Sequence, residues 1–485
     1  MSQLFRKKSI DALIADSEQS GRRLERSLGP WSLTALGIGA VIGSGIFSLT
    51  GTAASGVTLS THSIFHAPVL DLLLNGADAV STIGRPGAGP AVALSFIILA
   101  LICGLAGLCY AELASMIPVA GSAYTYAYAT MGEIIAWIIG WDLILEYAVS
   151  NMAVAVGFSA YINAILKTLI GVELPFVLSQ PMIVGGQFSG AWFNLPTLII
   201  LMGVTWVLVK GVQESAQANL VMVFIKVAAI LIFVFGAAGS VNAANYTPFM
   251  PNGFSGVLTG AAIVFFTYIG FDSISTAAEE CKNPKRDLPF GIFMTLGICA
   301  GVINWKDLDT AAPVAKALTS IGKDNLQVVV STGAVIGMLS SLLVFQYGQA
   351  RIWFAMARDR FLPDRFATVH PKYKTPHTAT WVAGFLVGIP AGIFDIGTFA
   401  DLSNIGTLFA FMLASVGVLV LRKTQPDRPR GFRVPWVPVI PILSIFFCFL
   451  LMLSLPLETW VRFFVWLGIG LAIYFFYGKK RAAEL

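Results

Sequence analysis

Two ionisable residues stand inside apolar runs of the sequence, and they are the first candidates for chemistry. Lys226 lies midway along the run Val221–Ile230, and Glu146 lies in Trp141–Tyr147. A cation at the centre of a membrane helix costs at least about 2.5 kcal/mol and is functional by default. Burial disfavours the charged amine, so Lys226 can load and release a proton. The alternatives are a lysine that reaches the interface or a fixed structural charge, and a Glu146 that shapes a pocket, pairs with a base or faces water.

A glycine-rich segment forms a second kind of candidate site. Four glycines fall between Gly37 and Gly45, and each interior glycine weakens a helix by up to about 1 kcal/mol. A helix that breaks there and restarts after Gly43 points free N–H groups at an anion such as a carboxylate. The alternative is that Gly39 and Gly43 form a small-residue seam for helix packing.

The segment Phe265–Asp272 has a similar character, because Gly270 interrupts an apolar run and a carboxylate follows. Two broken helices five spans apart predict inverted repeats. On this interpretation helices 1–5 and 6–10 are related by a two-fold axis in the membrane plane. The substrate lies between the interrupted helices, and helices 11 and 12 are accessory.

The composition predicts the membrane class that these elements require. Of the 485 residues, 56% are apolar and 12% are charged, whereas soluble domains carry about a quarter charged residues. A soluble globule is therefore excluded. The net charge of +5 comes from basic residues beside apolar runs, where membrane orientation explains them, so nucleic acid is not indicated.

Apolar runs long enough to cross a bilayer predict an all-α polytopic protein with twelve transmembrane helices. They are expected at 32–54, 89–110, 132–166, 195–212, 217–239, 255–280, 288–305, 326–348, 378–396, 401–421, 435–455 and 459–477. The short run 288–305 is retained because twelve crossings put most lysines and arginines on the side of the N-terminus, whereas eleven remove this excess.

These spans define the expected organisation of the chain. A cytoplasmic N-terminal segment is expected at 1–31, a transmembrane domain at 32–477 and a cytoplasmic tail at 478–485. The repeats are expected at about 32–239 and 255–421, followed by accessory helices at about 435–477. Residues 1–31 contain no apolar region typical of a cleavable signal peptide, so helix 1 is expected to target the chain.

Other reactive residues show no catalytic or metal-binding pattern. The five cysteines are scattered without CxxC spacing and are expected to pack as small apolar residues. No histidine lies within an expected span, and no Ser/His or HExxH arrangement occurs. We therefore expect no enzyme, no metal and no cofactor.

Several motifs together resemble one family of transporters. Gly37–Phe47 closely resembles the helix 1 signature of the amino acid-polyamine-organocation transporters. Further matching segments are Ala111–Ala114, Gly121–Tyr124, Gly270–Asp272, Glu279–Glu280, Asn283–Pro284, Tyr347–Arg351, Ala357–Pro363 and Asn404–Leu408. The match covers nearly the whole chain from residue 30 and is most similar to the bacterial cationic amino acid transporter group. From this resemblance, the segment from Tyr347 to Pro363 is expected to be the loop after helix 8.

The resemblance implies a substrate site between the two broken helices. N–H groups around Ser44 and Gly45 would hold the α-carboxylate of an amino acid. Carbonyl groups would receive its α-ammonium, and these are expected near Val41, Phe266, Thr267 and Ile269.

Lys226 matches the helix 5 lysine that replaces a sodium ion in proton-coupled members, so the coupling ion is expected to be H⁺. Glu146 and Phe345 would bound the side-chain end of the pocket, where the bulky ring favours small neutral amino acids. The rival view is that Glu146 recruits a cationic side chain.

Two departures from the family pattern are the long segment 55–87 and a shortened helix 7. The function expected is a proton-coupled symporter for alanine-like amino acids in the cell membrane, with no obligatory protein partner. An exchanger, a cationic amino acid transporter and an amino acid sensor that does not transport remain as alternatives.

Overall fold

The structure is a computed structural model of the chain. It describes residues 3–18, 33–34, 37–38, 40, 45–57, 63–76, 85–184, 187–238, 247–270, 315, 318–319 and 322–482. Five helices in these ranges are long and apolar enough to cross a bilayer, at Gly89–Met116, Glu133–Ile170, Asp324–Arg358, Asp401–Thr424 and Leu457–Ala482. Shorter apolar helices lie at Leu195–Lys210, Asn219–Phe233, Gly253–Tyr268 and Val439–Leu453. The expected helical membrane protein is confirmed to this extent. The expected span 288–305 lies outside the described residues, and the spans 32–54 and 255–280 are described only in part, the second of them as far as residue 270.

Two long helices form the centre of the bundle. They are α7 (Glu133–Ile170) and α15 (Asp324–Arg358), of 38 and 35 residues. They run antiparallel, since Gly140 faces Met356 near one end of the contact and Tyr147 faces Gly348 further along α7. The left-handed residue Gly171, with a φ of 69°, ends α7.

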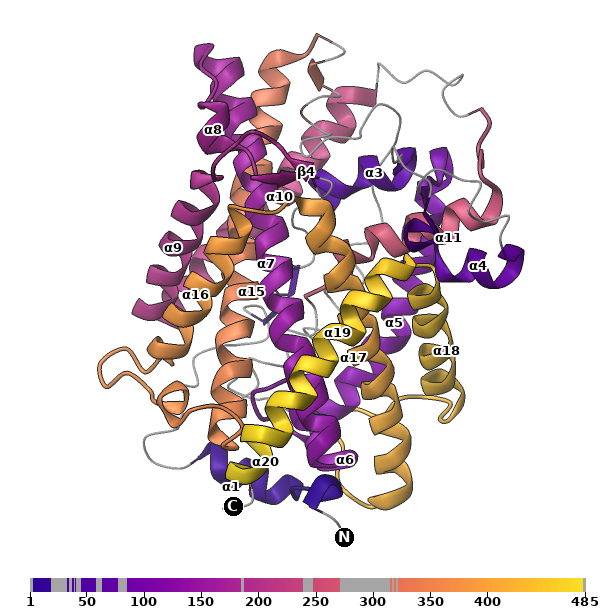
Figure 1. Cartoon of the computed structure of the whole chain (residues 1–485), viewed down its shortest axis with the longest axis vertical. Helices are drawn as coiled ribbons and strands as arrows, with labels where there is room; N and C mark the ends of the chain where they lie inside the picture. The colour runs from indigo at the N-terminus through magenta and orange to yellow at the C-terminus, as the bar shows by residue number, and fades with distance from the viewer. Residues whose placement is uncertain are drawn as a thin grey trace.

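The other long helices pack around this pair (Figure 1). Helix α10 (Val212–Ala238) packs on α15, and α17 (Ile396–Thr424) packs on α7. Helices α9 (Leu195–Lys210) and α16 (His377–Ala391) pack together on one side, and α5 (Val92–Met116) and α18 (Val439–Leu453) pack together on the other.

The remaining elements are short or peripheral. In chain order they are η1 (Gln3–Phe5), α1 (Ile10–Ser17), η2 (Gly45–Leu49), α3 (Thr50–Ser55), β1 (Gly56–Val57), η3 (Ile64–His66), α4 (Val69–Asn75), β2 (Arg85–Pro86), η5 (Gly89–Ala91), α6 (Ala123–Thr130), α8 (Phe176–Ser179), β3 (Ile183–Val184), β4 (Gln187–Phe188), α11 (Gly253–Val264), η7 (Phe265–Tyr268), η9 (Asp364–Ala367), α19 (Leu457–Ile473), η10 (Tyr474–Gly478) and α20 (Lys479–Ala482).

The expected loop from Tyr347 onward is wrong for its first part, because α15 continues as helix through Arg358. No proline lies between the start of α15 at Asp324 and Pro363. The two charged residues of the extension are buried, and their guanidinium groups lie over aromatic rings. Arg351 lies 3.8 Å from the ring centre of Tyr347, and Arg358 lies 5.6 Å from that of Phe354. Stacking of this kind allows an arginine to remain in a buried helix.

The described parts of the long segment 55–87 lie at the end of the bundle opposite the termini (Figure 1). Its short strands β1 and β2 pair with each other in antiparallel register. Arg85 of β2 makes two hydrogen bonds of 2.9 and 2.8 Å to the carboxylate of Asp401 in α17. This bidentate pair ties the two strands to α17.

The end of the bundle that carries both termini is called the base, and the N-terminal segment 3–18 lies across it (Figure 1). The Lys8 ammonium lies 2.6 Å from carboxylate oxygens of both Asp16 and Asp359. Burial opposes the charge on Lys8, but these two carboxylates outweigh it and raise the Lys8 pKa. Arg6 lies 3.1 Å from Glu133 at the start of α7. The segment therefore connects α7 with the end of α15.

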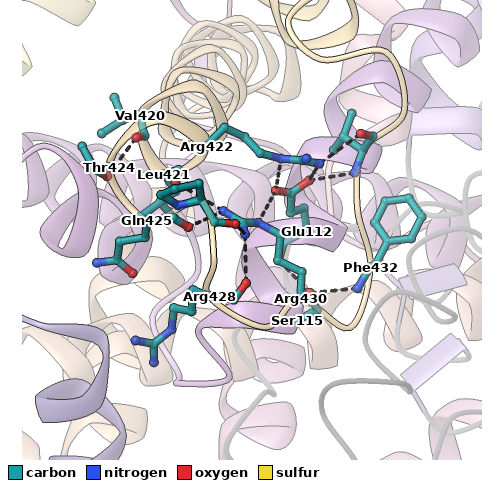
Figure 2. A network of polar contacts seen from close by, with 12 residues as sticks. Glu112, Ser115, Val420, Leu421, Arg422, Thr424, Gln425, Arg428, Arg430 and Phe432 are labelled. Atoms are coloured by element: carbon teal, nitrogen blue, oxygen red, sulfur yellow. Dashed lines mark hydrogen bonds and ion pairs between the residues drawn. The ribbon is translucent and has the colours of Figure 1, made fainter.

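A buried charge cluster links three other parts of the base (Figure 2). Glu112 of α5 receives hydrogen bonds of 2.8 and 2.7 Å from Arg422 at the end of α17. Arg430 in the following loop donates at 3.0 Å, and the backbone N–H of Val434 donates at 2.7 Å. Because both carboxylate oxygens are satisfied, the burial of Glu112 is compensated. The cluster fixes α17 and its loop to α5.

Candidate functional site

The helix that begins at Gly253 leaves the helical conformation where the sequence predicts a break. Helix α11 ends at Val264, the tighter turn η7 follows, and Ile269 is extended with φ −64° and ψ 135°. Gly270 then has a φ of 118°, which L-residues rarely adopt. Such a change of conformation leaves backbone groups outside the regular helical ladder. Phe266, Thr267 and Ile269, whose carbonyl groups are expected to bind the substrate, lie in this non-helical segment. All three residues are buried.

The end of this helix approaches the glycine-rich segment closely. A Cβ atom added at Gly270 would lie 2.2 Å from the Cβ of Ala40. Gly45 begins the short helix η2, which contacts η7. The structure therefore brings Gly45 and the break at 265–270 to the same region, while Val41 and Ser44 lie outside the described residues.

Three buried side chains, from α7, α15 and α17, form hydrogen bonds to the glycine-rich segment and to α11. The hydroxyl of Tyr161 on α7 donates to the carbonyl of Phe47 at 2.6 Å. The hydroxyl of Ser341 on α15 donates to the carbonyl of Ala40 at 3.3 Å.

On the α11 side, the Asn404 amide of α17 donates to the carbonyl of Ala262 at 2.8 Å. The sequence patterns predict no role for Tyr161 or Ser341, and Asn404 occurs in them only within the matching segment Asn404–Leu408. A polar side chain within an apolar span was the available signal for each of them.

Lys226 is fully buried in the contact between α10 and α15. Its ammonium donates to the hydroxyl of Ser340 at 3.3 Å, and this hydroxyl donates to the side-chain oxygen of Asn219 at 2.5 Å. Gly337 provides the space, since a Cβ there would lie 2.8 Å from the Lys226 Cβ. A lysine in this position does not reach the lipid interface, so this alternative for Lys226 is wrong.

Glu146 and Phe345 are both buried, but they lie on different contacts of the bundle. The ring of Phe345 on α15 packs edge-on against Tyr147 of α7, with ring centres 6.3 Å apart. Glu146 lies on the face of α7 toward α17, where the hydroxyl of Ser403 donates to its backbone carbonyl at 3.5 Å.

This arrangement defines a class of protein. Interrupted backbone at membrane depth is tolerated where it lines a cavity or meets a ligand, and half-helix ends attract charged groups of a substrate. A buried ammonium lies in the same bundle, on α10. A polytopic helical protein with these features is suited to move a small polar solute across a membrane, and none of its candidate groups forms a hydrolytic site.

Comparison with known proteins agrees with this class. Residues 28–475 match the amino acid permease family, and the chain belongs to this family. It is therefore a membrane transporter and not an enzyme.

Two relatives come from Bacillus subtilis (strain 168). The chain is 46% identical to a branched-chain amino acid permease, over 99% of this chain and 98% of the relative. It is 41% identical to a methylthioribose transporter, over 99% of both chains. It is also 31% identical to the chloroplastic cationic amino acid transporter 9 of Arabidopsis thaliana, over 96% of this chain and 90% of the relative.

Proposed function

We propose that the protein is a proton-coupled symporter that imports small aliphatic, neutral L-amino acids across the cell membrane. The observation that carries this proposal is the burial of Lys226 against Ser340 and Asn219. An ammonium held in a low-dielectric contact is stabilised by its hydrogen bond and can be neutralised by losing a proton. Alternate protonation of Lys226 would couple proton movement to the opening of the α10–α15 contact.

The proposed substrate site lies between the interrupted segments. Backbone N–H groups at Ser44 and Gly45 bind the α-carboxylate. Backbone carbonyls near Val41, Phe266, Thr267 and Ile269 bind the α-ammonium, and Glu146 and Phe345 bound the side-chain end. The burial of the described members of this set supports the assignment, because a zwitterion needs a site that replaces its water.

A neutral, aliphatic substrate is supported by the relative that is a branched-chain amino acid permease. The Phe345 ring would limit the size of the side chain that is accepted. Methylthioribose is a second candidate substrate because one relative of 41% identity is a methylthioribose transporter.

We further propose twelve crossings, with the base in the cytoplasm and two inverted five-helix repeats. Helix packing supports the repeats. If α7 corresponds to α15 and α10 to α17, the contact of α10 with α15 corresponds to that of α17 with α7. The helices α9 and α16 then correspond to each other, so the two-fold relation maps their contact onto itself. These paired contacts are those that a two-fold relation requires.

The test is uptake into liposomes that contain the purified protein, with and without an inward proton gradient. One pH unit corresponds to about tenfold accumulation for one-to-one symport. Gradient-driven accumulation of leucine or alanine is expected in the wild type and is expected to be lost in Lys226→Met. The matched control is Lys210→Met, because Lys210 is exposed and lies over the Trp206 ring at 3.7 Å.

The other outcomes identify the alternatives. Counterflow of amino acids without a response to the gradient would replace symport by exchange. Uptake of arginine in preference to leucine would assign Glu146 to a cationic side chain, and uptake of methylthioribose alone would replace the substrate class. Amino acid binding without any flux would identify a sensor.

A further inference from the structure

A row of polar residues lies on the face of α7 toward α17. Asp142, Glu146 and Ser150 are spaced by four residues, which places them on one side of the helix. The hydroxyls of Ser150 and Ser403 lie 2.6 Å apart. A Cβ atom at Gly406 would lie 2.8 Å from the Oδ1 atom of Asp142. The backbone of α17 therefore closes directly on the Asp142 carboxyl group.

Asp142 is fully buried, and neither of its carboxyl oxygens has a hydrogen-bond partner among the described residues. It lies nine residues after Glu133, and thus about 13 Å into the bundle from the base. An ionised carboxylate left without a donor in such a place is very unfavourable, whereas a neutral acid avoids most of this cost. An ionisable residue at this depth needs a functional reason.

Several charged and titratable groups lie on the helices that pack around α7 near Asp142. Among the described residues, they include Glu146 and Tyr147 on the same helix, Tyr347, Arg351 and Arg358 on α15, and Tyr124, Tyr126 and Tyr128 on α6. The two guanidinium groups lie over aromatic rings of their own helix, and the Tyr124 hydroxyl donates to Asp359 at 2.5 Å. Between Asp401 and Arg422, α17 has no charged residue.

The Asp142 contact also resembles the Lys226 contact. In both, one ionisable side chain is buried where a central helix meets its neighbour, and a glycine of the facing helix provides the space. Gly337 does so for Lys226 between α10 and α15, and Gly406 does so for Asp142 between α7 and α17. These are the two contacts that the proposed repeats exchange.

We propose that Asp142 is a second proton-binding site, which passes the transported proton between the level of Glu146 and the base. This inference rests on the proposed symport. The proton adds to one Asp142 oxygen to give the neutral acid while α17 is closed on α7. When the two helices separate and water enters, the acid releases the proton and becomes the carboxylate. Asp142 lies about 6 Å nearer the base than Glu146, since one helical turn separates them.

The experiment uses the full-length protein in liposomes, with Asp142→Asn as the neutral variant of the same shape. With a gradient of one pH unit, the wild type is expected to accumulate leucine about tenfold. Asp142→Asn is expected to lose this accumulation while retaining counterflow of labelled leucine. Ser150→Ala, on the same face of α7, is the control and is expected to behave as the wild type.

Infrared spectroscopy of the purified protein gives a readout that does not depend on transport. The wild type is expected to show a protonated carboxyl band at neutral pH, and Asp142→Asn is expected to lack it. If Asp142→Asn does not fold, Gly406→Ala keeps the carboxyl group, and its added methyl group is expected to shift the pH of half-maximal uptake. An unshifted pH in this variant contradicts the inference.

The outcomes separate the two proposals. If the wild type does not accumulate leucine in a gradient, the proposed symport is wrong. If the wild type accumulates leucine and Asp142→Asn accumulates it equally, symport stands and the role of Asp142 is refuted. A carboxyl band that is unchanged in Asp142→Asn also refutes it.

Discussion

Removal of the Glu112 charge is expected to destabilise the base of the bundle strongly. In Glu112→Gln, an amide NH2 group replaces one carboxylate oxygen and the negative charge is lost. The NH2 group then faces N–H donors of the arginines, with which it cannot form a hydrogen bond. The Arg430 side chain is fully buried and that of Arg422 is 24% exposed, so both guanidinium groups lose the carboxylate charge that they share, and that of Arg430 has no access to water. Breaking a buried ion pair from one side costs about 3–5 kcal/mol. The partial exposure of Arg422 places the expected loss near the lower end of this range.

The assay is thermal unfolding in detergent, followed by the amount of protein that remains monodisperse after heating. Glu458→Gln is the matched control, because Glu458 pairs with Arg462 at 3.4 Å on a partly exposed surface. Such pairs contribute about 0.3–0.5 kcal/mol. Glu112→Gln is expected to unfold at a clearly lower temperature than this control. Equal melting temperatures of the two variants would refute the reasoning, because the cluster would then contribute no more than a surface pair.

Three further predictions concern the interrupted helix and the base. Gly270→Ala adds a methyl group 2.2 Å from Ala40 at a φ of 118°, so it is expected to cost about 1–3 kcal/mol and to reduce leucine uptake in liposomes. Uptake and stability equal to the wild type would contradict the close approach. Burial and the neighbouring His370 lower the His377 pKa, so the folded protein resists protonation of His377 and loses stability as the pH falls through the ordinary value of 6.5. His377→Gln is expected to show a smaller fall in melting temperature between about pH 7.5 and 5.5, and an equal fall would argue against this role. Lys8→Met removes the ammonium group that lies between the carboxylates of Asp16 and Asp359. Trypsin is therefore expected to cleave the N-terminal segment faster in this variant than in the wild type. Equal cleavage rates would show that these ion pairs do not hold the segment.

The membrane class and most of the helices follow from the sequence alone, because apolar length and the cost of exposed backbone are local properties. The departure from helical conformation at 265–270 was also predictable, since Gly270 and the residues before it stand in one short segment, whereas a restart of the helix after residue 270 stays a prediction. Lys226 was identifiable because a single cation in an apolar run is conspicuous wherever the helix packs. The expected break in the glycine-rich segment stays a prediction for Val41 and Ser44, which lie outside the described residues.

Only the tertiary structure decided what these residues contact. The partners of Glu112 lie more than 300 residues away in the chain, and Ser340 lies 114 residues from Lys226. No local pattern encodes such pairings, because they depend on how helices pack side by side. The same holds for the extension of α15 to Arg358 and for Asp142. The sequence motif contains this carboxyl group, but its isolation arises only when Gly406 of another helix closes on it.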